Sequence, residues 1–157
     1  MKPNIEIPAA ELEKIAALLN GLLADEYVIY TKTRNAHWNI QGQNFMELHK
    51  FFQSQYEQLF IIIDDVGERV RMLGHFAIGS LKDFLKFTHL PEQTNEFTDQ
   101  RQVLKALIAD HESIIRNIRM EIAPVSESSN DIGSTDFVTG IMEQHEKMAW
   151  MLRAYLG

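Results

Sequence analysis

Cysteine is absent from the 157 residues of this chain, so disulfide bonds, thiolate zinc sites and cysteine nucleophiles are excluded. The sequence also lacks any apolar run near the roughly 20 residues that a membrane-spanning helix needs. Its first ten residues, MKPNIEIPAA, do not have the basic and then apolar pattern of a signal peptide. We therefore expect a cytoplasmic protein whose length fits one domain, residues 1–157, with a sizeable core.

Positive charge is scarce. The chain has 15 lysines and arginines against 22 aspartates and glutamates, which gives a formal net charge of −7. A negative surface repels nucleic-acid phosphate and attracts cations. Only Lys2 precedes the first predicted helix, so we do not expect binding to DNA through a basic arm.

Strand-like alternation is missing as well, and four long segments have helical spacing of apolar residues. We predict helices over about residues 8–37 and 44–72, a third capped by Thr98, and a fourth after Pro124 and the polar run SESSND. The side chains expected to face inward from the fourth helix are Phe137, Ile141, Met148, Met151, Leu152 and Tyr155.

The connections between these segments are unequal in length. Gly42 marks a tight turn before an N-cap at Asn44, and Gly74 lies where a C-cap glycine is expected. Residues 75–96 form a long connection that contains a short amphipathic piece over residues 80–87. An all-α, ferritin-like four-helix bundle with a short extra helix between helices two and three follows from this arrangement.

The second helix carries more apolar surface than one stripe requires. The residues predicted to lie off its main face are Phe51, Phe60, Ile61 and Ile62. They indicate either a wide core face or burial against another subunit, and we favour the second interpretation.

Two imidazoles and two carboxylates form a candidate ligand set for a mid-series divalent metal such as Fe(II). These residues are His37, His49, Asp64 and Glu68. At about 1.5 Å rise per residue, His49 and Asp64 are roughly 22 Å apart on one helix, too far to share a metal. Two such helices running antiparallel across a two-fold axis near residue 57 would unite the pairs. Alternatively, the carboxylates belong to a solvated charged face, and His37 is a helix C-terminal residue favoured by the dipole.

The pattern HWNxxGxxFxxxH over residues 37–49, followed by DxxxER over residues 64–69, resembles the signature of the Dps family of mini-ferritins. The resemblance covers nearly the whole chain, including the ending MAWMLRAYLG. It implies a hollow dodecamer whose ferroxidase sites lie at two-fold interfaces, with His37 and His49 from one subunit and Asp64 and Glu68 from its partner. Trp38 matches the family tryptophan beside the site, with a role in packing or as a local electron donor.

The activity that this resemblance implies is oxidation of iron(II), preferentially by hydrogen peroxide, and storage of ferric mineral, which protects against oxidative damage. It further implies acidic pores that admit iron, for which Glu127, Asp131 and Asp136 are the candidates; otherwise these acids belong to a solvated loop. Gln53 stands where many members have an acidic residue of a second iron position, and Glu57 is a possible substitute.

Two other functions fit less well. A larger ferritin with a site inside each bundle would use Glu-x-x-His pairs, but no acidic residue lies three positions before any histidine. Those positions hold Arg34, Met46, Met72, Lys86, Ile108 and Met142. The other alternative is a non-enzymatic structural or nucleoid-associated assembly. Among the remaining histidines, His111 and His145 lie on apolar stripes and are expected in the core, and His75 and His89 lie near turns without evident partners.

Overall fold

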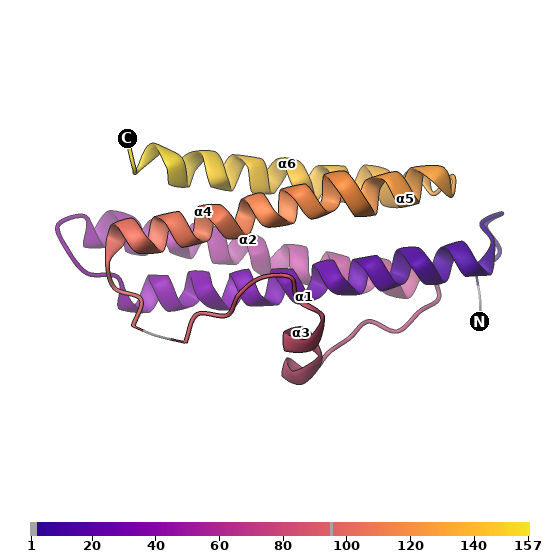
Figure 1. Ribbon diagram of the computed structural model, residues 1–157, viewed down its shortest axis with the longest axis horizontal. Coiled ribbons are helices and arrows are strands. Elements are labelled where there is room, and N and C mark those ends of the chain that lie inside the picture. Colours follow the sequence, from indigo (N-terminus) through magenta and orange to yellow (C-terminus); the bar gives the residue numbers. More distant parts are fainter. Residues whose placement is uncertain (1–2, 95) are drawn as a thin grey trace.

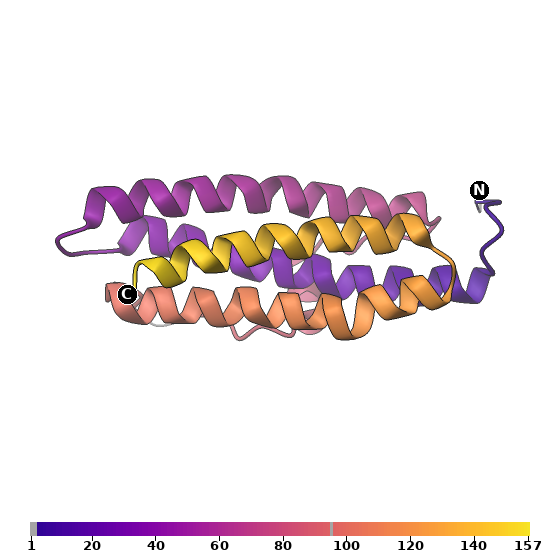
Figure 2. The same cartoon turned by 90° about the horizontal axis from the view of Figure 1, so that it is seen from above.

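A computed structural model describes residues 3–94 and 96–157, and within them all regular structure is helical. Four long helices lie side by side along one axis, and α6 ends at the opposite end of the bundle from the start of α1 (Figures 1 and 2). The elements in chain order are α1 (Ala9–Asn39), α2 (Phe45–Met72), α3 (Leu81–Phe87), α4 (Gln100–Asn117), the π-helical turn η1 (Ile118–Ile122), α5 (Ala123–Ser128) and α6 (Ile132–Ala154). The predicted four-helix bundle with a short extra helix is confirmed.

The turn between α1 and α2 is tight because of a glycine. Gly42 has a φ of 118°, a conformation that L side chains rarely adopt. The backbone beside it is tied to the start of α4, since Gln100 Nε2 donates to the Gln41 carbonyl at 2.9 Å. As a result the last turn of α1 lies beside the first turns of α2.

The C-terminus of α2 is closed by Gly74, as predicted. This glycine has a φ of 83°, and its N–H donates to the Arg71 carbonyl at 2.9 Å. The N–H of His75 donates to the Val70 carbonyl at 3.3 Å. These two bonds form the Schellman motif, which satisfies carbonyls that a helix end otherwise leaves without partners.

The core runs through the centre of the bundle, where α1 packs along α2 and α4 packs along α6. The prediction for Ile62 was wrong, because this side chain is only 2% exposed. It lies three residues after Leu59 and four before Val66, both fully buried, so helical spacing places it on the core face. Met151 and Tyr155 were also expected inside, but they are 38% and 41% exposed.

The second half of the chain differs from the prediction at two boundaries. Asp99, not Thr98, caps α4, since its carboxylate accepts the Gln102 N–H at 2.8 Å. The helix does not stop at Pro124, which lies in the first turn of α5. Proline has no N–H and its ring clashes with the carbonyl four residues earlier, and η1 widens the backbone just before it.

The chain therefore stays helical through Ser128, and only the last residues of the run SESSND form the break before α6. Asn130 lies there with a φ of 57°. The short helix α3 packs outside the bundle against α1 (Figure 1), where Phe84 stacks on Tyr27 with ring centroids 3.9 Å apart. Within the described ranges, none of the helices combines the length and apolar character needed to cross a membrane.

Candidate metal centre

His37, near the end of α1, and His49, in the second turn of α2, form a stacked pair with ring centroids 3.8 Å apart. Each ring is fixed by the backbone of the other residue: His37 Nδ1 donates to the His49 carbonyl at 2.7 Å, and His49 Nδ1 donates to the His37 carbonyl at 2.8 Å. Because a carbonyl oxygen can only accept, each Nδ1 carries the proton. In the neutral form of each ring, the lone pair is then on Nε2, which is the arrangement in which imidazole binds a metal.

Aromatic side chains hold the histidine pair in place. The Tyr56 ring meets His37 edge-on at 5.2 Å, and the Phe45 ring stacks on His49 at 5.2 Å. His37 is buried at 8% exposed, whereas His49 is half-buried and reaches the surface in part. Trp38 is 63% exposed, and the Arg34 guanidinium lies 4.9 Å above its ring centroid. The indole is therefore largely exposed to solvent and follows His37 directly in the chain.

Asp64 and Glu68 form the second half of the candidate set, in the C-terminal half of α2. They are four residues apart and share one face of the helix. Both side chains are exposed, and neither makes an ion pair within the described part of the chain. Fifteen residues separate Asp64 from His49, which corresponds to roughly 22 Å along the helix.

One chain therefore presents two half-sets at opposite ends of α2. Among residues 3–94 and 96–157, no group of three or more His, Asp or Glu side chains could hold a single metal ion. The structure brings His37 to His49 and Asp64 to Glu68, but it keeps the two pairs apart. Between them, Phe60 and Ile61 are 62% and 60% exposed.

The residues considered for a second iron position are linked to each other. Gln53 Nε2 donates to Glu57 Oε1 at 2.8 Å on the exposed face of α2. Glu57 remains an exposed carboxylate. Its role as a metal ligand stays a prediction.

The predicted group of pore acids has to be corrected at Asp131. This carboxylate is 3% exposed and pairs with Arg69, with Nη2 and Oδ1 3.0 Å apart. It also caps α6 by accepting the Ser134 N–H at 2.9 Å. Asp131 is therefore a buried acid whose carboxylate is already bonded to Arg69 and to the N-terminus of α6, unlike an exposed pore carboxylate. Glu127 and Asp136 are exposed.

His111 and His145 lie in the core, as predicted, and both are fully buried. Their Nδ1 atoms are 2.8 Å apart, and His145 Nε2 lies 2.9 Å from Glu26 Oε1. Burial, with a smaller contribution from His145, lowers the pKa of His111 well below its usual value. Glu26 was missed, although it lies four residues after Leu22 on the apolar stripe of α1, the position that indicates a buried polar side chain.

Two further buried acids on α1 and α4 tie the bundle to the long connection. Asp110 pairs with the buried Lys32, and Lys32 also donates to the Pro91 carbonyl at 3.0 Å. Burial raises the pKa of Asp110, and Lys32 opposes this shift. Asp25 accepts the His89 N–H at 2.6 Å and lies 3.0 Å from His89 Nδ1. His89, for which the sequence suggested no partner, thus anchors the connection to α1.

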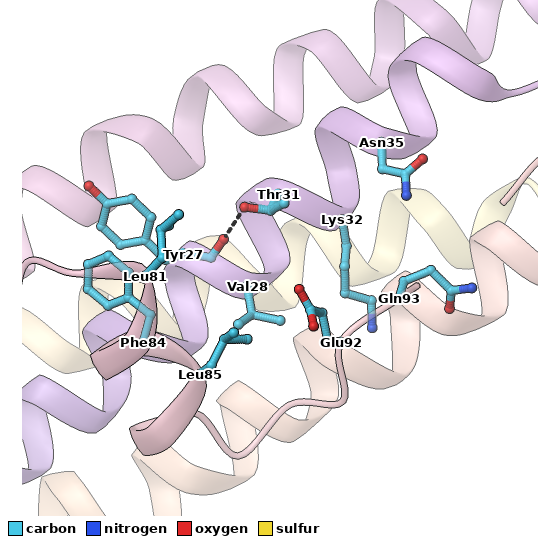
Figure 3. A pocket seen from close by; sticks show the side chains of 10 residues that line it. All are labelled: Tyr27, Val28, Thr31, Lys32, Asn35, Leu81, Phe84, Leu85, Glu92 and Gln93. Carbon is cyan, nitrogen blue, oxygen red and sulfur yellow. Dashed lines mark hydrogen bonds between the residues drawn. The ribbon is translucent and has the colours of Figure 1, made fainter. Parts of the chain in front are cut away.

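A hollow of about 210 Å³ lies between α1, α3 and the following segment (Figure 3). Its walls include Val28, Leu81 and Leu85, together with Lys32 and Glu92. Lys32 is already paired with a buried acid, and the walls are mostly apolar. This hollow therefore offers no group of metal ligands.

Comparison with known proteins gives consistent matches over nearly the whole chain. Residues 16–157 match the ferritin-like domain family. The DNA protection during starvation protein 2 of Bacillus anthracis is 32% identical over 146 residues, covering 92% of this chain and 97% of that protein. A low temperature-induced protein of Nostoc sp. is 38% identical over 153 residues, covering 98% of this chain and 86% of that protein.

Among solved structures, the DPS protein of Vibrio cholerae O1 superposes with a TM-score of 0.93 at 32% identity, covering 100% of this chain and 98% of that one. It is described as a member of the ferritin-like diiron-carboxylate proteins. The fold and these matches define the class as a ferritin-like bundle. Within that class, the chain belongs to the Dps family. Family membership supports a role in iron storage in general terms.

Proposed function

We propose that this protein is a ferroxidase and iron-storage mini-ferritin. Iron(II) binds between two subunits, with His37 and His49 from one chain and Asp64 and Glu68 from the other. The observation that carries this proposal is the division of the ligands into two half-sets that α2 holds roughly 22 Å apart. Neither half-set alone has enough ligands to fill the coordination sphere of a metal ion. Together they supply two nitrogen donors and two carboxylates, which suit Fe(II).

The chain's own residues account for how such a site would be held. The reciprocal bonds to backbone carbonyls fix both imidazole tautomers before iron arrives, so binding needs no reorientation of the rings. Exposed Phe60 and Ile61 lie between the half-sets, where a second α2 would cover them. Burying such side chains stabilises an interface by roughly 1.5–3 kcal/mol each.

Hydrogen peroxide is the proposed oxidant. Two iron(II) ions supply two electrons, the O–O bond breaks, and two protons complete the formation of two water molecules. The ferric product is stored as mineral inside a hollow dodecamer built from two-fold dimers, which removes both iron(II) and peroxide and so limits oxidative damage. DNA binding is not part of this proposal, because a net charge of −7 repels nucleic-acid phosphate.

An anaerobic iron(II) titration followed by separate peroxide and oxygen pulses tests this function. We expect saturable iron(II) binding and fast oxidation after the peroxide pulse. Substitution of both histidines, His37→Ala with His49→Ala, should abolish the fast phase and leave the assembled particle intact by size-exclusion chromatography. An intact particle of the unsubstituted protein that binds no iron(II) would instead support the non-enzymatic structural alternative.

A further inference from the structure

A second hollow, of about 250 Å³, opens beside the carboxylate half of the proposed site. Asp64 and Glu68 lie on its wall, together with Tyr27 from α1 and residues of the segment after α2. This volume is below the roughly 300–1,000 Å³ of pockets that hold organic ligands. The hollow is therefore suited to a very small molecule next to iron bound at these carboxylates.

Gly67 keeps this hollow open on the α2 side. It lies between Asp64 and Glu68 in the helix, where glycine is less favourable than alanine by about 1 kcal/mol. A Cβ added at Gly67 would meet no atom within 4 Å, so packing does not require glycine there. A side chain at this position would instead occupy space beside the two carboxylates.

Tyr27 gives the hollow a hydrogen-bonding group. Its ring is fixed against Phe84, with centroids 3.9 Å apart and planes 15° from parallel. Figure 3 shows its hydroxyl pointing away from Lys32 and Glu92, and the bond drawn at Tyr27 uses its backbone carbonyl, which accepts from Thr31 Oγ1 at 2.8 Å. Tyr27 lines both hollows, and its hydroxyl lies on the side of the ring away from the charged wall of the first one.

Arg71 contributes a positive charge to the lining of the hollow. Its guanidinium is held by a 2.7 Å bond to the His75 carbonyl and by the Phe76 ring, whose centroid is 4.7 Å away. A fixed positive charge disfavours a second metal cation at this position. Because Asp64 and Glu68 on the same wall disfavour an anion, the lining fits a neutral oxygen species, which a phenol O–H can also bind.

We propose that Tyr27 is a positioning residue for the oxidant, and that its hydroxyl hydrogen-bonds hydrogen peroxide in this hollow. This inference rests on the proposed function, in which iron(II) at the site supplies the two electrons that reduce peroxide to water. Tyr27 contributes a hydrogen bond only and is neither oxidised nor deprotonated. Dioxygen is a weak hydrogen-bond acceptor, so the hydroxyl would favour peroxide over oxygen.

The variant Tyr27→Phe tests this inference, because it keeps the ring stacked on Phe84 and removes only the hydroxyl. We expect the KM for hydrogen peroxide to rise about three- to tenfold, the loss typical of one hydrogen bond. The kcat, the anaerobic iron(II) stoichiometry and the rate with oxygen should stay unchanged. Gly67→Ala, which narrows the hollow without a clash, should raise the same KM. Tyr155→Phe, at an exposed tyrosine near the C-terminus, is the matched control.

The possible outcomes are distinct. An unchanged peroxide KM in Tyr27→Phe overturns this inference and leaves the proposed function standing. A fall in the number of iron(II) ions bound also overturns it, because Tyr27 would then serve iron binding. An equal loss of oxidation rate with peroxide and with oxygen overturns it too, because Tyr27 would then serve packing. If the unsubstituted protein shows no peroxide-driven oxidation, the proposed function and this inference fail together.

Discussion

The two histidines of the candidate site are linked through each other's backbone. Each Nδ1 is bonded to the other residue's carbonyl, so both rings present Nε2 without any further partner group. This arrangement requires the α1–α2 turn to hold residues 37 and 49 in a fixed register. It also means that the donor atoms are fixed in the single chain, before a partner or iron is present.

The second histidine pair, His111 and His145 in the core, leads us to expect that the stability of the fold depends on pH. The folded state lowers the pKa of His111 below its ordinary value of 6.5. Below about pH 6.5 the unfolded chain therefore takes up a proton that folded His111 does not, and the free energy of unfolding falls as the pH falls. The stability that neutral His111 contributes is fully present above this pH. Below it, the free energy of unfolding falls by up to about 1.4 kcal/mol per pH unit.

Denaturant unfolding at pH 7.5, 6.5 and 5.5 checks this prediction at a fixed protein concentration. His111→Gln should lose much of the pH dependence, and His75→Gln, at a partly exposed histidine, should keep it. If the free energy of unfolding changes with pH equally in the unsubstituted protein and in His111→Gln, His111 is not the group responsible.

At the scale of single residues, the sequence predicted which residues lie on the core side of a helix better than it predicted the partners of each side chain. The periodicity of α4 and α6 placed His111 and His145 in the core. The same reasoning took Asp131 for an exposed acid, because the sequence does not show that Arg69, 62 residues earlier, supplies its counter-charge. The Nδ1 bonds of His37 and His49 could not be predicted either, since they depend on backbone carbonyls brought together by the fold.

At the scale of elements, the helices and turns followed from local chemistry. Gly42 and Gly74 both adopt the positive φ angles that glycine tolerates, and the long connection contains α3 as expected. The exception is the region around Pro124, where a π-helical turn lets the helix continue. Proline usually ends a helix, and the accommodation of Pro124 depends on packing between η1, α5 and α6.

The α1–α2 turn gives a prediction at this scale. Gly42→Ala should lower the free energy of unfolding by about 1–3 kcal/mol, because a β-carbon is strained at a φ of 118°. Gly140→Ala is the control, since Gly140 lies within α6 and an added Cβ meets no atom within 4 Å. Its stability should be unchanged or higher by up to about 1 kcal/mol. Denaturant unfolding of both apoproteins measures the difference, and equal stabilities would contradict the assigned role of Gly42.

At the scale of the whole molecule, the single chain is an incomplete metal centre with an exposed apolar strip between its two halves. The bundle has a buried apolar core that does not include the four ligand residues, so we expect it to fold when they are substituted. Assembly and catalysis should therefore be separable by mutation. The two half-sets can be inactivated independently, one in each of two variants.

Complementation between two such variants tests the division of ligands between subunits most directly. One variant carries His37→Ala and His49→Ala, and the other carries Asp64→Asn and Glu68→Gln; each alone should lack fast peroxide-driven iron oxidation. Mixing them as assembled particles should not restore activity. Dissociating and reassembling them together should restore about a quarter of it, since random pairing makes half of the dimers mixed and each mixed dimer has one intact site. Mixed dimers that form but stay inactive would contradict the shared site.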